Sequence, residues 1–190
     1  MHRGFDSIKK YVIEYFFTEL PDGLYYHNLD HTLDVVEAAV RIGQAEGLSS
    51  SDIELLEVAA MFHDVGFVDS YENNEVLGAE YAERTLPDWG FSKEEIEKIT
   101  SAIKATNLGI PPKDLFEMVL CDADLDYLGR DDFNHRSQLL FQELKKWGKI
   151  ESDDQWNEIQ KVFLAKKHYF TNYSLKNRAP EVKKRLDELL

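Results

Sequence analysis

Apolar residues recur along this chain at the spacing of amphipathic helices. Leu29, Leu33, Val36 and Val40 lie three or four positions apart, and the isoleucines of segment 96–103 repeat the pattern. This spacing places apolar side chains on one face of a helix. Strand-like alternation of apolar and polar residues is missing over any useful length. The pattern therefore predicts an all-α protein built as a helical bundle.

Short turns separate the predicted helices. These helices span residues 4–20, 28–46, 52–65, 73–86, 93–107, 113–127, 131–147, 153–169 and 178–190. Segments 51–54, 92–95 and 152–155 each have the spacing of a capping box, in which two side chains satisfy free amides at a helix start. Neither a repeat nor a long linker interrupts the series, so one domain is expected.

Composition narrows the class of protein. Hydrophobic residues make up 43% and charged residues 31% of the 190 positions, as in a globular chain. The net charge of −14 opposes binding to a phosphate backbone, so we expect no nucleic-acid partner. Apolar runs are too short to cross a bilayer, and the N-terminus has no signal-like apolar stretch. With Cys121 as the single cysteine, we expect a cytoplasmic protein without a membrane partner.

Histidine and aspartate residues gather at the ends of three predicted helices. His27 and His31 are four positions apart and share a helix face. The His63-Asp64 dipeptide closes a largely apolar helix, and the Asp-x-Asp segment 122–124 closes another. Buried ionisable groups need partners, and a divalent cation satisfies several at once. Imidazole and carboxylate ligands suit Mn, Fe, Mg, Co, Ni or Zn.

Each feature also has an ordinary interpretation. A single buried histidine is usually a hydrogen-bonded core residue, and an acidic residue at a helix end is usually a cap or a solvated group. A histidine pair at helical spacing also arises by chance. The joint occurrence of all three features favours a metal site over these alternatives.

These residues lie in segments that resemble a known family. The order His31, His63-Asp64, Asp124 is similar to that of the HD superfamily of metal-dependent phosphohydrolases. YHNLDHTLDVV (26–36) also resembles the opening of the catalytic domain of the related cyclic-nucleotide phosphodiesterases. AAMFHDVGF (59–67) resembles the HD helix, and DADLDYLGRD (122–131) resembles the segment carrying the last aspartate. The resemblance implies one HD domain over residues 1–190, with its motifs in 26–131 and helices of 132–190 packed on them.

The resemblance also implies roles for individual residues. One divalent ion is expected, with four ligands: His31, His63, Asp64 and Asp124. His27 matches the position that protonates the leaving group, while Asp64 is also expected to assist the attacking water. The positions expected to face substrate are Asn28, Tyr127, Arg130 and Asp131. For two of these residues there is an alternative to substrate contact. Asn28 would instead fix the local backbone geometry, and Arg130 would instead pair with Asp131 or Asp132 on the surface.

Departures from related groups limit the expected chemistry. Relatives that hold a second metal carry further histidines, whereas segments 72–81 and 103–109 contain none here. A glutamate at 72, 75 or 80 offers an oxygen ligand, but an exposed helix face is the simpler interpretation. Phe67 stands where HD-GYP proteins carry lysine. We therefore expect a mononuclear site.

The resulting functional prediction is a phosphohydrolase that cleaves a phosphomonoester or phosphodiester of a small molecule, most simply a nucleotide, with metal-activated water. The first alternative is a catalytically silent HD module that binds a nucleotide or a metal as a sensor. Another is a di-iron, oxygen-activating protein, which needs more ligands than the sequence offers. The sequence leaves the oligomeric state open.

Overall fold

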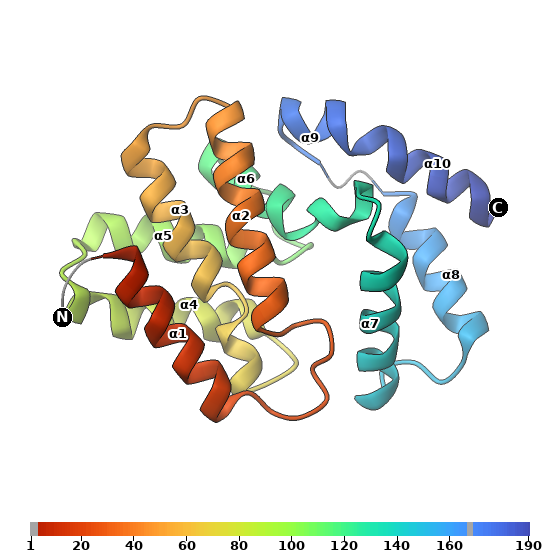
Figure 1. Cartoon of the computed structure of the whole chain (residues 1–190), viewed down its shortest axis with the longest axis horizontal. Helices are drawn as coiled ribbons and strands as arrows, with labels where there is room; N and C mark the ends of the chain where they lie inside the picture. The colour runs from red at the N-terminus through yellow and green to blue at the C-terminus, as the bar shows by residue number, and fades with distance from the viewer. Residues whose placement is uncertain (1–3, 167–168) are drawn as a thin grey trace.

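The structure is a computed structural model that describes residues 4–166 and 169–190. All regular secondary structure in these ranges is helical, which confirms the all-α prediction (Figure 1). The α-helices are α1 (Phe5–Glu19), α2 (Leu29–Ala45), α3 (Ser50–Phe62), α4 (Asn74–Thr85), α5 (Lys93–Ala105), α6 (Leu115–Asp124), α7 (Phe133–Lys146), α8 (Asp153–Leu164), α9 (Asn172–Asn177) and α10 (Ala179–Leu189). Short 3-10 helices are η1 (Val65–Val68), η2 (Leu86–Trp89) and η3 (Asp126–Gly129).

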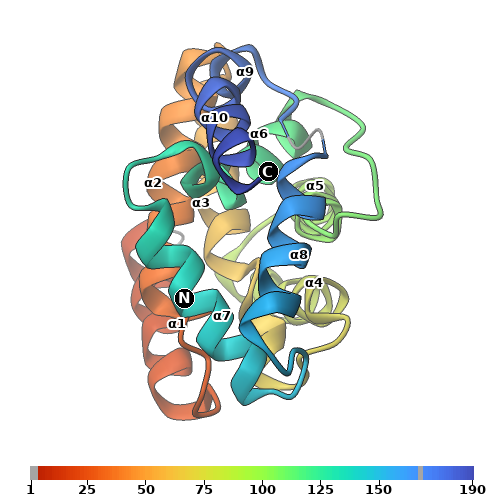
Figure 2. The same ribbon diagram turned by 90° about the vertical axis from the view of Figure 1, so that its right-hand side faces the viewer.

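The helices form two packed groups. Helices α1 to α6 surround a large apolar cluster whose fully buried members include Ile42, Leu56, Phe62 and Ile103. Figure 2 shows α7, α8 and α10 in front of this group. A second, smaller cluster lies under them, formed by Tyr26, Tyr127, Leu128, Phe133, Leu164, Tyr169 and Val182. Tyr26 of this cluster stacks on His31 at the start of α2, with ring centroids 4.5 Å apart, so the predicted metal ligands lie where the two groups meet.

Several helix boundaries differ from the predicted ones. Among the predicted capping boxes, that of Ser92 and Glu95 is present in full. At α3 the cap is Ser49 instead of Ser51, because the Ser49 hydroxyl accepts from the Asp52 amide. At α8 the Ser152 hydroxyl caps the helix, but Gln155 accepts from the amide of Glu151, outside the box.

The C-terminal part of the chain departs most from the prediction. Helix α8 ends at Leu164, before the predicted end at 169, and α9 follows as a separate short helix. A long-range contact explains the break: buried Asp122 accepts hydrogen bonds from the amides of Phe170 and Thr171 and from the Thr171 hydroxyl. Since these donors come from segments nearly 50 positions away, a local pattern cannot reveal the break.

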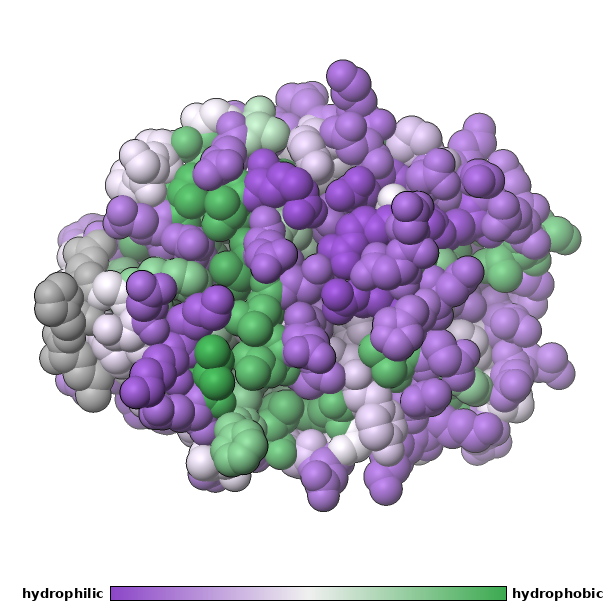
Figure 3. Space-filling view, viewed as in Figure 1, coloured by the Kyte–Doolittle hydropathy of each residue, from purple (hydrophilic) through white to green (hydrophobic). Residues whose placement is uncertain are grey.

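The outer surface is strongly polar. Figure 3 shows hydrophilic residues over most of one face, with an apolar band in the region of α1 and α2. At the end of α1, the exposed side chain of Phe17 and the neighbouring Leu20 line a shallow surface pocket. None of the helices in the described ranges has both the length and the apolar content to cross a membrane.

Gly66 in η1 lets α4 approach the end of α3 closely. A Cβ atom at Gly66 would lie 2.0 Å from the carbonyl oxygen of Asn74, and one at Gly78 would lie 2.9 Å from the carbonyl oxygen of Phe62. Both obstacles are backbone atoms, which cannot turn away as a flexible side chain can. The turn after His63-Asp64 is thus held by backbone packing against α4.

We expect Gly66→Ala to lower the free energy of unfolding by about 3 kcal/mol, because the added methyl forces two backbone segments apart. Chemical denaturation followed by circular dichroism measures the change. Gly4→Ala is the control: a Cβ there meets no atom within 4 Å, so its effect should stay within about 1 kcal/mol. Equal stability of the two variants would contradict the proposed close approach.

Candidate metal centre

Four side chains from three separate helices converge at the boundary between the two groups. His31 lies in the first turn of α2, His63 and Asp64 follow α3, and Asp124 ends α6. His31 Nε2 is 3.4 Å from His63 Nε2 and 3.1 Å from Asp124 Oδ1. Asp64 Oδ2 is 3.4 Å from His31 Nε2 and 3.2 Å from His63 Nε2. The structure therefore brings together all four residues predicted as metal ligands.

Hydrogen bonding orients His63 for ligation. Its Nδ1 lies 2.7 Å from the carbonyl oxygen of Ala60. A carbonyl can only accept, so Nδ1 carries the proton and, in the neutral ring, Nε2 presents a lone pair to the cluster. An imidazole fixed by a backbone carbonyl on its far nitrogen is a common arrangement in metal sites.

Asp64 carries the strongest indication of a missing partner. Its Oδ2 atom is buried and has no hydrogen-bond partner among the described residues, although both imidazole Nε2 atoms lie nearby. Leaving a buried carboxylate oxygen unsatisfied is costly. Atoms that bind one ion at about 2.1 Å lie roughly 3 to 3.4 Å apart, close to the separations found here. His31, His63 and Asp124 form a compact group of donors within 4.8 Å of one another, and Asp64, close to both imidazoles, is the fourth candidate ligand for one divalent cation.

The charges of the cluster are strongly coupled. Burial alone raises the pKa of Asp124, but hydrogen bonds to His31 and His63 outweigh it and hold the pKa below its usual range. Burial likewise opposes ionisation of Asp64, whose pKa is nevertheless lowered, mainly by His63. Burial lowers the pKa of His63, but the charges of Asp64 and Asp124 outweigh it and raise that pKa well above its ordinary value. A bound divalent cation would replace the proton of this imidazole as the counter-charge of the two carboxylates. Asp124 has a 22% exposed side chain, while the other three are at most 7% exposed, so the site opens on the Asp124 side.

His27 lies beside this cluster and is held by a residue that sequence reasoning missed. The His27 ring centroid is 5.8 Å from that of His31, and His27 stacks on Phe67 with centroids 4.3 Å apart. Its Nδ1 forms a very short hydrogen bond with Oε1 of Glu143 on α7. Glu143 also accepts from the amides of Tyr26 and His27 and from the Tyr71 hydroxyl. This buried carboxylate fixes the orientation of the His27 ring through Nδ1, and the ring's other nitrogen, Nε2, is not used in that hydrogen bond.

Glu143 also controls the charge of His27. Burial by itself lowers the pKa of His27, but the hydrogen bond to Glu143 and the negative charge of Asp64 overcome it and raise the pKa. The sequence does contain one sign of a special role for Glu143: this acidic residue lies between Leu140 and Leu144 on the apolar face of its helix. Its hydrogen-bond partner His27 is 116 positions away in the sequence, so helical periodicity could not identify that partner.

Two of the predicted substrate contacts have clear structural surroundings. Asn28 is the N-cap of α2: its Oδ1 accepts from the amides of Asp30 and His31, and its Nδ2 donates to the carbonyl of Tyr25. This arrangement favours the geometric role over phosphate contact. Tyr127 packs against Tyr26, with ring centroids 5.3 Å apart, and lines a cavity that His27 also lines.

Arg130 and Asp131 lie in a different setting. Arg130 forms ion pairs with Asp34 and Asp132, at 2.8 and 2.5 Å, and lies 3.4 Å from Asp126. The pairing with Asp132 matches the alternative given to Arg130 above, and Asp131 is exposed. The network ties α2 to η3 and α7. A phosphate contact by Arg130 would require breaking these pairs and stays a prediction.

Ligands for a second metal do not gather beside the first in the described ranges. The donor atoms of His31, His63 and Asp124 lie within 4.8 Å of one another. Glu72 instead pairs with Lys149 at 2.9 Å, and Glu75 accepts a long hydrogen bond of 3.4 Å from Asn107. Glu80 is exposed. The single-ion expectation stays a prediction.

Comparison with known proteins agrees with this geometry. The HD domain model matches residues 28–126, from the N-cap of α2 to the first residue of η3. A crystal structure of a predicted HD superfamily hydrolase from an uncultured Thermotogales bacterium is 23% identical and superposes with a TM-score of 0.65. That match covers 96% of this chain and 87% of the other, which shows a shared fold along nearly the whole chain. The search of curated proteins found no significant match. Because the family match spans just over half of the chain and contains all four predicted ligands, this chain belongs to the HD domain family.

Proposed function

We propose that this protein is a metal-dependent phosphohydrolase that acts on a small phosphate ester, with a nucleotide as the first substrate to test. The observation that carries the proposal is the unsatisfied, buried Oδ2 of Asp64 among three further ligand-type side chains. His31, His63, Asp64 and Asp124 would hold one divalent ion. Such an ion lowers the pKa of water and polarises a phosphoryl oxygen.

The residues around the ligands support an acid–base role for this chain. His27 is placed to donate its Nε2 proton to the leaving oxygen, and Glu143 holds the opposite nitrogen. Stacking on Phe67 restricts the plane of the His27 ring. Asp64 is proposed to accept a proton from the attacking water through the carboxylate oxygen that does not hold the ion. Buried Cys121 is a free thiol, which is consistent with action in the reducing cytoplasm.

The test is metal analysis of the purified protein followed by a phosphate-release screen. Nucleotides and sugar phosphates are offered with Mn²⁺ or Mg²⁺, and chelator-treated protein is the control. We expect about one ion per chain and phosphate release that stops on chelation and resumes with metal. Stoichiometric metal with nucleotide binding but no turnover would replace this proposal with the sensor alternative.

A further inference from the structure

A cavity of about 240 Å³ lies between η3, α7 and α8, and His27 is one of the residues that line it. Its walls include the aromatic rings of Tyr127, Phe133 and Trp156 and the aliphatic side chains of Leu140 and Ile159. The His27 ring also lies next to that of the predicted ligand His31, with centroids 5.8 Å apart. A substrate whose phosphate lies at the metal centre can therefore place its organic group in this cavity.

The lining chemistry restricts what this organic group can be. Apart from His27, the described side chains that line the cavity carry no charge, and most are apolar. The Tyr71 hydroxyl, one of the few polar groups, is committed to Glu143. Hydroxyl groups buried here without partners would lose their hydration without compensation. A polyhydroxylated sugar therefore fits poorly, and an apolar group fits well.

The volume restricts the size of the group. A closed apolar cavity of roughly 150 Å³ is enough for benzene. The larger volume here suits one ring or two fused rings, and Tyr127 and Phe133 offer nearly parallel aromatic faces, inclined by 14°. Aromatic groups gain from offset-stacked or edge-to-face contacts with such rings.

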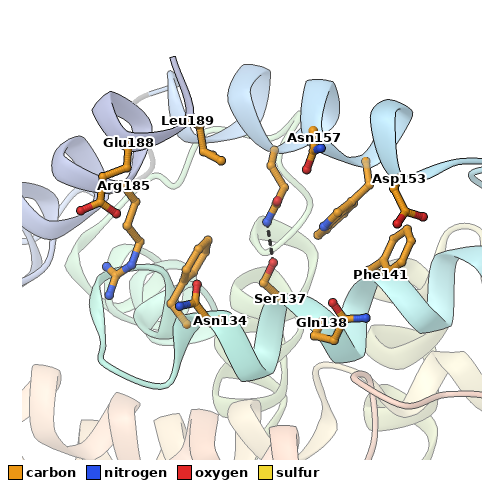
Figure 4. A pocket seen from close by; sticks show the side chains of 12 residues that line it. Asn134, Ser137, Gln138, Phe141, Asp153, Asn157, Arg185, Glu188 and Leu189 are labelled. Atoms are coloured by element: carbon orange, nitrogen blue, oxygen red, sulfur yellow. Dashed lines mark hydrogen bonds between the residues drawn. The ribbon is translucent and has the colours of Figure 1, made fainter.

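A hydrogen bond joins two residues that line the cavity. Gln160 Nε2 on α8 donates to Ser137 Oγ on α7 at 2.5 Å. Beyond this pair lies an outer groove of about 390 Å³, where polar residues such as Asn134, Asp153 and Arg185 gather (Figure 4). Ser137 and Gln160 line both spaces, so their hydrogen bond separates the apolar cavity from the polar groove.

We propose that the cavity between α7 and α8 binds the organic group of the substrate, and that this group is an uncharged, mainly apolar system of one or two fused rings. A nucleobase and a simple aryl group share this chemistry. That the substrate's phosphate lies at the metal centre rests on the proposed function, whereas the binding of a ring in the cavity is independent of it.

The first test uses metal-free protein and 2-naphthol as an uncharged two-ring probe, with binding measured by calorimetry. We expect wild-type protein to bind 2-naphthol at least 10-fold more tightly than glucose. Ile159→Glu should weaken 2-naphthol binding at least 10-fold, because it adds a charge to the cavity wall. Val162→Glu is the matched control on the same helix: Val162 is 59% exposed and does not line the cavity, so binding should change less than 2-fold.

A second variant guards against an indirect effect of the added charge. Ile159, which is 39% exposed, lines the cavity, and Ile159→Trp adds uncharged bulk to that wall; this variant should weaken 2-naphthol binding to a similar extent. Equal binding of 2-naphthol by wild-type protein and both Ile159 variants would overturn the proposal, as would equal affinity for glucose.

The second test separates this inference from the proposed function. With Mn²⁺, we expect kcat/KM for 2-naphthyl phosphate to exceed that for glucose 6-phosphate at least 10-fold, with most of the advantage lost in Ile159→Glu. Adenosine monophosphate tests the nucleobase source of the same chemistry. Turnover of all substrates at equal kcat/KM would overturn the ring inference and leave the hydrolase proposal intact. If 2-naphthol binding depends on the cavity but no substrate releases phosphate, the ring inference stands and the hydrolase proposal fails.

Discussion

Replacing His63 and Asp64 together by alanine is expected to remove the metal and abolish phosphate release. The double variant leaves His31 and Asp124 as the remaining pair of predicted ligands, and two donors on separate helices hold a divalent ion poorly. Metal content should fall from about one ion per chain to a trace. Activity in the screen above should fall by at least about 10³-fold, since the ion supplies several kcal/mol of stabilisation to the developing charge.

Asp122→Asn is the matched control for the loss of metal. Asp122 lies two positions before Asp124 on the same helix and is fully buried, but its oxygens bind Phe170 and Thr171 instead of facing the imidazoles. This variant should retain metal while losing stability. Circular dichroism verifies that both proteins are folded. Stoichiometric metal in the folded double alanine variant would show that the ligand assignment is wrong.

Glu143→Gln is expected to lower kcat by about 10²-fold while metal content and KM stay close to those of the wild type. The Glu143 carboxylate accepts a hydrogen bond from His27 Nδ1 and raises the pKa of that ring. Without the carboxylate, the His27 ring is less firmly oriented and its pKa is lower. General acid catalysis is typically worth about 10² to 10⁴ in rate. The amide keeps an oxygen acceptor for the neighbouring backbone amides, which limits the damage to folding.

A double-mutant cycle with His27→Ala tests whether Glu143 acts through His27. If it does, Glu143→Gln should cause little further loss of kcat once His27 is alanine. Tyr71→Phe is the control: it removes another hydrogen bond to Glu143 and should lower kcat by no more than about 3-fold. Fully additive losses for Glu143 and His27 would assign Glu143 a general structural role instead of a positioning one.

Local patterns in the sequence were enough for most of the helical framework. The spacing of Leu29, Leu33 and Val36 correctly predicted α2, and Ser92 with Glu95 correctly predicted the start of α5. These features depend on contacts three or four positions apart, which any sequence displays directly. The same locality explains the errors. The end of α8 and the separate α9 follow from the contacts of Asp122 with residues 170 and 171.

The candidate ligands show the same division. Their order along the chain, through its resemblance to the HD superfamily, was sufficient to select His31, His63, Asp64 and Asp124. Tertiary structure placed an oxygen of each aspartate 3.1 to 3.6 Å from both imidazole Nε2 atoms and left one oxygen of Asp64 without a hydrogen-bond partner. It also showed what Asp122 does instead: α6 turns Asp124 toward His31 and Asp122 toward Thr171.

By itself the sequence therefore determined the helical class and the family, and it predicted four ligand positions by their residue types and order. Only the tertiary structure revealed that Glu143 holds His27 and that an apolar cavity lies beside that pair. The same structure engages Arg130 with three aspartates. The physical reason is distance along the chain: periodicity encodes contacts within a helix, whereas a buried acid and its histidine meet only when helices far apart in sequence pack together.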